Sequence, residues 1–396
     1  MLCANDMSYT FLMSADVLSR DIERLLIVMP TWVGDVVMAT PTLRALRGLF
    51  TRAQITVLSN RNVRPLLDGC PWIDRVVTVR QGSESPDQPG KSTVRRGMLP
   101  LARRLGAAHF DVAVLLPNSF RAALLVRLAG IDHRVGYDRD GRGGLLTDLL
   151  VPRRDHDGYV PVSTRDYYLG IARFLGATRV ETTMQLFTRR EDDQAADDLL
   201  ARCGHEVHSG RRLVVINPGA KFGQAKLWPA PRFARLADLL IQRHDVDVAL
   251  TGAPDERVIL DEVQAAAMHE LCDLPAGGLN LKRLKSVMRR CDLLVTNDTG
   301  TRHIGAAMGT PVVTIFGPTN PAWTTIDYDA ERQVRVDVYC SPCQKKTCPL
   351  RGTPEDHQCM TLIDPEMVLQ RCEQLLKSHR TCSSPVSDVM PSRGLS

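Results

Sequence analysis

The 396-residue sequence has no uninterrupted run of eighteen or more apolar residues, which is the length that a membrane-spanning helix requires. Its first twenty residues contain Asp6 and Asp16 but no basic residue before Arg20. A secretory signal peptide begins instead with a positively charged region. We therefore expect a cytoplasmic protein without a membrane span.

Aromatic residues are scarce, at 5% of the sequence, and no G-x-G-x-x-G motif follows any expected strand. The absence of that motif counts against a nicotinamide-dependent dehydrogenase. The sequence also lacks a basic run interleaved with aromatic residues and a helix-turn-helix pattern, so a nucleic-acid-binding module is disfavoured. The apolar content of 44% and the charged content of 24% are instead typical of a soluble globular protein, and the length is enough for two to three domains.

Excess positive charge is confined to the first half of the chain. The net charge is only +5, yet residues 91–154 contain 12 basic residues, all but Lys91 of them arginine, against 5 acidic residues. Arginine suits bidentate contact with phosphate groups. This stretch is therefore either an ordinary solvated face or a surface for a phosphorylated partner or an anionic membrane.

Short apolar runs alternate with segments of helical periodicity, which predicts an α/β protein built on parallel sheets. The expected strands are residues 25–29, 55–58, 75–79, 112–116, 213–216, 246–250, 293–295 and 312–315. One apolar helix face runs from Val36 to Phe50. Further helices are expected near residues 229–243, 255–269 and 301–308.

Two similar halves of the chain meet near residues 180–210. We predict an N-terminal extension over residues 1–22, a first domain over 23–185, a second domain over 186–378 and a disordered tail over 379–396. Open α/β sheets bind ligands at the polar turns that follow their strands. The functional site is therefore expected between the two domains.

The first strand ends in a polar turn, Met-Pro-Thr-Trp-Val-Gly-Asp at residues 29–35. Asp35 falls in the first turn of the following helix, where the helix dipole favours an ionised carboxylate. Asp35 is therefore a candidate general base near neutral pH. The alternative is an aspartate that only caps the helix.

Lys226 directly precedes a helix in the second half and follows the turn Asn-Pro-Gly-Ala-Lys at residues 217–221. A lysine beside a loop of this kind can neutralise a diphosphate as a point charge. The alternative is a lysine that is merely exposed on a loop.

A second polar turn of this half starts at residue 297 with Asn-Asp-Thr-Gly-Thr-Arg-His. The N–H groups of Thr299, Gly300 and Thr301 would face phosphate oxygens at the start of a helix, and the helix dipole would assist binding. Asp298 could accept hydrogen bonds from sugar hydroxyls. The alternative is a capped helix start without a ligand.

Five segments together resemble one protein family, the heptosyltransferases of lipopolysaccharide core assembly, in glycosyltransferase family 9. They are Pro-Thr-Trp-Val-Gly-Asp at residues 30–35, Leu-Pro-Asn-Ser-Phe-Arg at 116–121, Asn-Pro-Gly-Ala at 217–220, Lys-Leu-Trp-Pro at 226–229, and residues 297–321, from Asn-Asp-Thr-Gly to Phe-Gly-Pro-Thr-Asn-Pro. Each segment alone is a weak signal, but their order along the chain makes the resemblance specific.

The resemblance implies a GT-B fold, in which two Rossmann-like domains face each other across a cleft. The first domain would hold the acceptor and the second the nucleotide sugar. The implied reaction moves heptose from ADP-heptose to the inner-core heptose of a phosphorylated lipid A-core acceptor, with inversion and without a catalytic metal or other cofactor. The enzyme would act as a peripheral protein at the cytoplasmic face of the inner membrane. The alternatives are a family 9 sibling with another donor or acceptor, or a non-catalytic nucleotide-sugar binder.

The resemblance also implies roles for individual residues. Asp35 would be the base that takes the proton of the acceptor hydroxyl. The donor would be held by Lys226, Asp298, Thr299, Gly300, Thr301 and His303, with Asp255 or Glu256 near the ribose. The acceptor would be held by Asn118, Ser119, Arg121 and Arg142, of which Arg142 is the preferred phosphate contact.

The chain has eleven cysteines, and in a cytosolic protein we expect them to stay reduced, without disulfides. Cys340, Cys343, Cys348 and Cys359 show the spacing C-x2-C-x4-C-x10-C. These four residues could close a structural zinc site, remote from the reaction, or could be ordinary buried or surface thiols.

Overall fold

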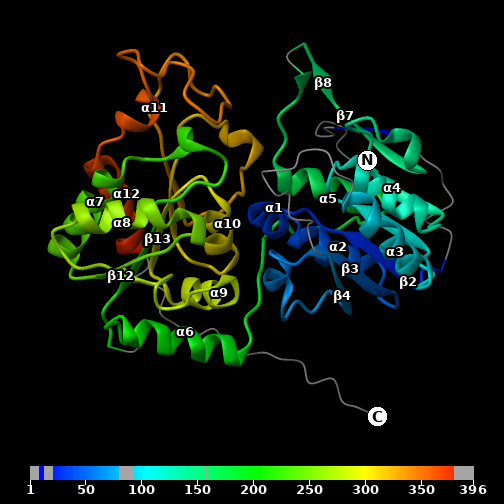
Figure 1. Ribbon diagram of the computed structural model, residues 1–396, viewed down its shortest axis with the longest axis horizontal. Helices are drawn as coiled ribbons and strands as arrows, with labels where there is room; N and C mark the ends of the chain where they lie inside the picture. The colour runs from blue at the N-terminus through cyan, green and yellow to red at the C-terminus, as the bar shows by residue number, and fades with distance from the viewer. Residues whose placement is uncertain (1–8, 13–20, 80–92, 157, 208, 379–396) are drawn as a thin grey trace.

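The computed structural model describes residues 9–12, 21–79, 93–156, 158–207 and 209–378, and these residues form two mainly parallel sheets covered by helices (Figure 1). The expectation of an α/β protein is confirmed. Within these ranges no helix is both long enough and apolar enough to cross a membrane. The predicted tail and most of the N-terminal extension lie outside the described residues.

The first sheet has seven strands in the order β1-β7-β6-β5-β2-β3-β4. They are β1 (Tyr9–Leu12), β2 (Arg24–Val28), β3 (Gln54–Asn60), β4 (Arg75–Val79), β5 (Val112–Leu115), β6 (His133–Tyr137) and β7 (Asp148–Pro152). Only β1, which belongs to the predicted extension, runs antiparallel to its neighbour. The sequence did not indicate β6, because His133 and Arg134 interrupt its apolar pattern and only its pairing with β5 makes it a strand.

The helices of this half are α1 (Val33–Met38), α2 (Thr40–Leu49), α3 (Thr93–Gly106), α4 (Phe120–Leu128) and α5 (Thr164–Phe174). The single helix expected from Val36 to Phe50 is two helices, α1 and α2. Pro41 lies in the first turn of α2, where its missing N–H is tolerated, whereas inside a continuous helix it would remove a hydrogen bond. The break leaves α1 as a short separate element that carries Asp35.

The second sheet has six parallel strands in the order β12-β11-β10-β13-β14-β15. They are β10 (Leu213–Asn217), β11 (Asp247–Leu250), β12 (Cys272–Asp273), β13 (Leu293–Asn297), β14 (Val312–Ile315) and β15 (Glu331–Val334). The helices are α6 (Arg190–Arg202), α7 (Ala230–His244), α8 (Arg257–Ala266), α9 (Leu281–Arg290), α10 (Gly300–Ala307), α11 (Gln358–Thr361) and α12 (Pro365–Ser378). A small hairpin, β8 (Arg154–Asp155) with β9 (Gly158–Tyr159), extends from the first half.

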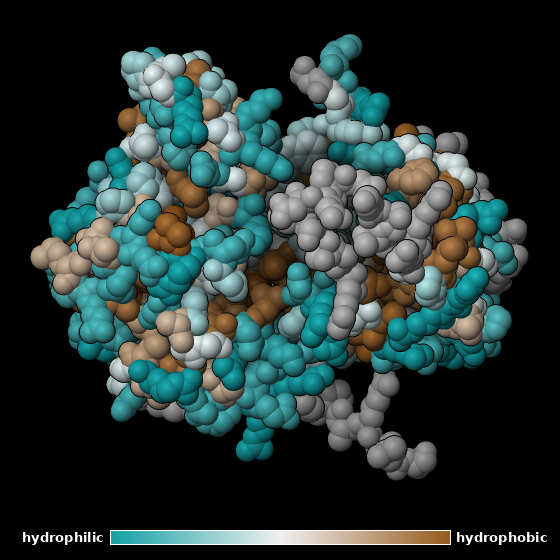
Figure 2. All heavy atoms as spheres, in the orientation of Figure 1, coloured by the Kyte–Doolittle hydropathy of each residue, from teal (hydrophilic) through white to brown (hydrophobic). Residues whose placement is uncertain are grey.

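The central strands of both sheets are buried on both faces, as parallel strands covered by helices must be. Leu25, Leu26 and Ile27 of β2 are fully buried. One apolar cluster includes Val37 of α1 and Ile304 of α10, so the two halves pack against each other directly. In the space-filling view the visible surface is mainly hydrophilic, with hydrophobic residues showing in the middle between the halves (Figure 2).

Strand order reverses at one place in each sheet. In the first sheet β3 lies on one side of β2 and β5 on the other, and in the second sheet β11 and β13 flank β10 in the same way. Crevices at such reversal points are where open α/β sheets bind ligands. The helices that follow β2 and β13, α1 and α10, lie against each other between the two halves (Figure 1), so the two favoured ligand positions face each other.

Candidate active site

Asp35 is the third residue of α1 and is half-buried at the junction of the halves. The residue before the helix, Trp32, makes no side-chain cap, and among the described residues no hydrogen bond or ion pair to the Asp35 carboxylate is found. Burial raises the pKa of Asp35 to about 6. Asp35 is therefore not a capping residue, and burial outweighs the helix dipole that was expected to keep its pKa low. The carboxylate is mostly ionised at pH 7 to 8 and close to its titration range.

Two glycines allow α1 and α10 to approach each other closely. A Cβ atom at Gly300 would lie 2.8 Å from the Val33 side chain and 3.2 Å from the Gly34 nitrogen. A Cβ atom at Gly34 would lie 2.9 Å from Cδ2 of His303. Asp35 is therefore one residue away from the point where the first half touches the start of α10, which is the juxtaposition that the sequence predicted.

Gly300→Ala is expected to destabilise the protein by about 1–3 kcal/mol, because the added methyl group overpacks the contact with Val33. The matched control is Gly48→Ala in α2, where a Cβ would meet nothing within 4 Å and where alanine should stabilise the helix by about 0.5–1 kcal/mol. Urea unfolding of both variants measures the two effects. Equal changes in the two variants would show that the close approach of α1 and α10 is not required.

The N-terminus of α10 presents free backbone donors. Thr299 is its N-cap residue, and the Thr299 hydroxyl is held by Nδ2 of Asn217 at 3.2 Å and by the Thr296 hydroxyl at 3.2 Å. No acceptor for the N–H groups of Thr299, Gly300 or Thr301 occurs in the part of the chain that the structure describes. Such a helix start binds anions.

Lys226 and Asp298 form a buried ion pair beside this helix start. Nζ of Lys226 donates to Oδ2 of Asp298 at 2.6 Å and to the Asp298 carbonyl oxygen at 2.9 Å. Thr319 donates to the same carboxylate oxygen at 2.9 Å, and the Arg302 guanidinium lies 3.5 Å from the other. Burial would raise the pKa of Asp298, but Lys226 and Arg302 outweigh it and hold the pKa below its usual value.

These contacts revise two expectations. Lys226 is not an exposed loop lysine, and its ammonium group retains one N–H for a ligand. Asp298 was expected to receive sugar hydroxyls, but its oxygens are already engaged by Lys226, Thr319 and Arg302. Asp298 instead positions the cations of the site.

Of the two acidic residues expected near the ribose, the structure brings only Glu256 to the strand ends. The Glu256 carboxylate accepts from the Ala253 N–H at 2.7 Å and occupies the space that a side chain at Gly219 would need. Burial raises the pKa of Glu256. Asp255 is exposed and pairs with Lys221 at 2.5 Å, so its side chain is not directed toward the strand ends.

His303 lies in α10 with its ring against the backbone of Gly34. It is almost completely buried, and burial, with a smaller effect from Arg302, lowers its pKa to about 3. The ring is therefore neutral at working pH. Its Nδ1 atom is buried and has no hydrogen-bond partner among the described residues.

On the acceptor side, three of the four predicted contacts are used within the protein. Oδ1 of Asn118 accepts from the Tyr167 hydroxyl at 3.0 Å and from Nη2 of Arg142 at 3.2 Å. Ser119 caps α4 by accepting from the Ala122 N–H. Arg142 is fully buried, and its guanidinium also donates to two backbone carbonyl oxygens, one at 2.9 Å. The expectation that Arg142 contacts a phosphate directly is therefore corrected: it holds the loop after β5.

Two arginines of the basic stretch lie near this loop, one exposed and one half-buried. Arg121 is exposed at the start of α4 and makes no ion pair with any described residue. Arg139, which was not among the predicted acceptor contacts, is an electrostatic neighbour and hydrogen-bond partner of Tyr167. The guanidinium groups of Arg139 and Arg154 both stack on the ring of Tyr159, at 4.0 and 4.3 Å from its centroid. The local excess of arginine was the signal that could have found them.

The cysteines depart from expectation in two respects. Cys203 at the end of α6 and Cys272 in β12 form a disulfide, with Cα atoms 5.3 Å apart, so the prediction of fully reduced cysteines is wrong. These residues are 69 positions apart in sequence, and only the packing of α6 beside the second sheet brings them together.

The Cys-rich segment 340–359 is not remote from the candidate site. The Ala225 N–H donates to the Lys346 carbonyl oxygen at 3.1 Å, and the Ala225 carbonyl oxygen lies 2.8 Å from Nε2 of His357. The segment therefore contacts the loop that carries Lys226. As their side chains stand, no three His, Cys, Asp or Glu residues within the described ranges are placed to hold a metal ion.

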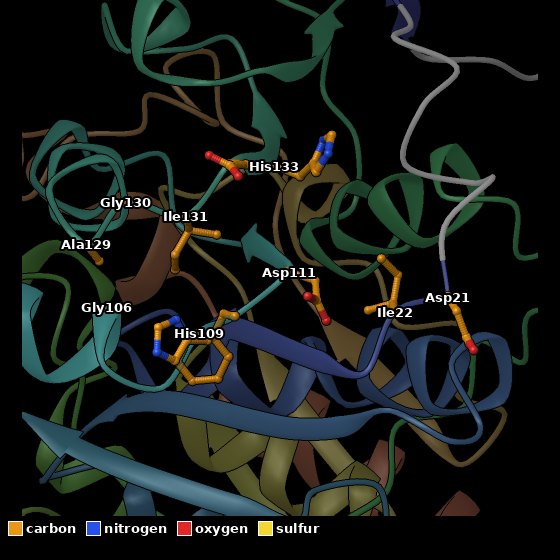
Figure 3. A pocket seen from close by; sticks show the side chains of 11 residues that line it. Asp21, Ile22, Gly106, His109, Asp111, Ala129, Gly130, Ile131 and His133 are labelled. Atoms are coloured by element: carbon orange, nitrogen blue, oxygen red, sulfur yellow. The ribbon is translucent and has the colours of Figure 1, made fainter.

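A separate pocket lies at the amino ends of the strands of the first sheet (Figure 3). Its lining includes Ile22, Asp111 and His133, which lie at the amino ends of β2, β5 and β6. Asp35 follows the carboxyl end of β2, and parallel sheets bind ligands at that end. This pocket is therefore not part of the candidate active site.

Known proteins that are similar to this chain belong to one family. The sequence model of glycosyltransferase family 9 (heptosyltransferase) matches residues 98–353. Lipooligosaccharide heptosyltransferase 2 of Haemophilus influenzae is 29% identical over 365 residues, which cover 89% of this chain and 99% of that protein. Lipopolysaccharide heptosyltransferase 2 of Salmonella typhimurium is also 29% identical over 365 residues, with 89% and 98% covered.

A solved structure extends the likeness to the fold. The structure of ADP-heptose lipopolysaccharide heptosyltransferase II from Escherichia coli matches with a TM-score of 0.73 and 26% identity, covering 90% of this chain and 99% of that one. The expected GT-B fold and the resemblance to heptosyltransferases are thereby confirmed.

Proposed function

Because the chain belongs to glycosyltransferase family 9, the heptosyltransferases, we propose that it transfers heptose from ADP-heptose to the inner-core heptose of a phosphorylated lipid A-core acceptor. The chain is a glycosyltransferase, and its relatives are named for heptose transfer to lipopolysaccharide or lipooligosaccharide. The observation that carries the proposal is the placement of an unpaired carboxylate, Asp35, one residue from the contact with the free N–H groups of α10.

The donor diphosphate binds at the start of α10 in this proposal. The N–H groups of Thr299, Gly300 and Thr301 donate to its oxygens, and the ammonium group of Lys226 adds a positive charge. Breaking the bond between sugar and diphosphate leaves negative charge on ADP, and fixed donors aimed at that charge stabilise the transition state. These groups supply the charge stabilisation that the leaving diphosphate needs, so we propose that catalysis requires no metal ion. Glu256 is positioned near the ribose.

Asp35 acts as the general base. It accepts the proton of the acceptor hydroxyl as that oxygen forms a bond to the anomeric carbon and the bond to the diphosphate breaks. A single displacement of this kind inverts the anomeric centre. The absence of an internal partner suits the role, because a paired carboxylate would be a weaker base.

The acceptor approaches over the first half of the chain. Arg121 supplies exposed charge beside the Asn118 loop, and Arg139, which is half-buried and 3.8 Å from Asp140, supplies a second guanidinium there. Arg142 holds the loop in place through its hydrogen bonds. Because the acceptor is phosphorylated and carried on a lipid, Arg121 and Arg139 contact its phosphates while the enzyme works at the cytoplasmic surface of the inner membrane.

The pH dependence of the transfer follows from the raised pKa of Asp35. The base must be ionised, so kcat/KM is expected to be constant above about pH 7 and to fall about tenfold per pH unit well below the pKa of about 6. Initial rates across a series of constant-ionic-strength buffers give the profile. Binding of ADP-heptose measured over the same range should stay flat across this limb, because its diphosphate is esterified at both ends and has no proton that titrates there. A limb centred near the ordinary aspartate value of 3.8 would contradict the burial argument.

The direct test is incubation of the protein with ADP-heptose and defined truncated core acceptors, followed by mass and linkage analysis of the product. We expect one added heptose, with ADP release that depends on the acceptor. An acceptor without phosphate should have a higher KM. A product with a different sugar or linkage would indicate a family sibling, whereas donor binding without release of ADP would indicate a non-catalytic binder.

A further inference from the structure

We propose that Cys340, Cys343, Cys348 and Cys359 bind one zinc ion, and that this ion fixes the loop that carries Lys226. The four residues belong to a segment that the proposed transfer reaction does not use. The metal site stands by itself, whereas its effect on donor binding rests on the function proposed above.

The fold brings the two ends of the Cys-rich segment together at Gly317. The Ser341 hydroxyl donates to the Gly317 carbonyl oxygen at 2.7 Å, which anchors the Cys340–Cys343 turn there. On the other side, Sγ of Cys359 lies 3.3 Å from where a Cβ of Gly317 would be. Gly317 therefore lies against both the turn that holds Cys340 and Cys343 and the side chain of Cys359.

Cys348 joins this group through the backbone. Its Sγ atom accepts from the His357 N–H at 3.3 Å, two residues before Cys359. The electrostatic neighbours of the Cys359 thiol include Cys340, Cys343 and Cys348. All four thiols are free, and the disulfide of the described chain lies elsewhere, between Cys203 and Cys272.

A set of four cysteine thiolates suits a tetrahedral zinc ion. Zinc accepts four cysteine sulfurs at about 2.3 Å in sites that are structural and closed to solvent. Without a cation the four sulfurs do not stand at ligand distance, so binding requires them to turn toward a common centre and to release their protons. The short C-x2-C spacing places two ligands on one turn, as zinc-binding turns do.

The bound ion would act on the donor site through the backbone. Within the segment that the cysteines enclose, Lys346 and His357 both hydrogen-bond to the backbone of Ala225. Gly223 packs so tightly on Lys346 that a Cβ there would lie 2.9 Å from its Cα. Lys226, the next residue after Ala225, therefore takes its position from this segment. The zinc ion has a positioning role and does not touch the substrate.

The first measurement is the metal content of the full-length protein, purified under reducing conditions without chelators. About one zinc per chain is expected, and titration with a mercurial reagent should release it as four thiols react. Cys348→Ser should lose the metal. Cys70→Ser, which changes a free cysteine outside the segment, is the matched control and should keep it. Protein without stoichiometric zinc, or Cys348→Ser protein that retains it, would overturn the metal site.

The second measurement is ADP affinity by calorimetry, before and after zinc removal from the wild-type protein, with circular dichroism to confirm that the fold persists. Loss of the ordered loop is expected to weaken ADP binding about tenfold, and added zinc should restore it. Unchanged affinity after zinc removal would overturn the positioning role. If the wild-type protein holds zinc but does not bind ADP at all, the proposed transferase function fails while the metal site remains.

Discussion

Replacement of Asp35 by asparagine is expected to lower the rate of heptose transfer by about 10²–10⁴-fold and to leave ADP affinity unchanged. The asparagine side chain keeps the size and polarity of aspartate but cannot accept the proton of the acceptor hydroxyl. Single-turnover assays give the rate, and calorimetry gives the affinity. The acidic limb of the pH profile should disappear in whatever activity remains.

The same substitution is expected to stabilise the protein at neutral pH. The pKa of Asp35 is raised from 3.8 to about 6 in the folded protein, so folding favours its protonated form and the ionised form costs stability. This cost is complete above pH 6 and absent below pH 3.8. After allowance for solvent screening of a half-buried group, Asp35→Asn should gain about 1 kcal/mol near pH 8 and nothing at acid pH.

The control is Asp198→Asn, on the exposed face of α6. It should change neither transfer nor the free energy of unfolding. An Asp35→Asn enzyme with full activity would refute the assignment of the base. A variant that is inactive and also loses stability at pH 8 would show that Asp35 has a structural role instead.

Removal of the Asp298 carboxylate is expected to have the largest effect on stability. In Asp298→Ala the ammonium group of Lys226 and the guanidinium of Arg302 would lose a buried counter-charge. Breaking a buried ion pair by deleting one partner costs about 3–5 kcal/mol, because the remaining charge stays desolvated. Urea unfolding should show this loss, and ADP affinity should fall because Lys226 no longer has a fixed position.

The matched control is Asp255→Ala, which removes the partner of Lys221. Both partners of this pair are largely exposed, and exposed pairs contribute only about 0–1 kcal/mol. The comparison separates a buried from an exposed Lys–Asp pair within the same half of the chain. Similar losses in the two variants would contradict the structural role of Asp298.

Much of the fold was predictable because parallel strands are buried on both faces and so stand out as apolar runs. β4 and β14 match their predicted bounds, and the turns that hold Asp35 and Gly300 follow strands as expected. β6 escaped because His133 and Arg134 break its apolar pattern, and pairing with β5 compensates for weak local preference. The break between α1 and α2 was overlooked although Pro41 marks it.

For the site residues, too, some features were predictable from the sequence and others were not. Sequence spacing predicted Asp35, Lys226 and the start of α10 as site residues, since residues after strand ends have a defined place in an open sheet. It could not show that Arg142 is buried or that Asp298 is already paired, because those facts depend on side chains that are distant in the sequence. Arg139 was hidden among the other arginines of the basic stretch.

By itself, the sequence determined the fold class, the two-part organisation and the family, because these follow from local apolar patterns and from short motifs in a fixed order. Only the tertiary structure decided which polar groups remain free to act. Burial raises the pKa of Asp35. Tertiary packing also pairs Asp298 with Lys226 and places the Cys-rich segment against the loop that carries Lys226. Solvation and charge pairing depend on all neighbours in space, and a linear pattern does not contain them.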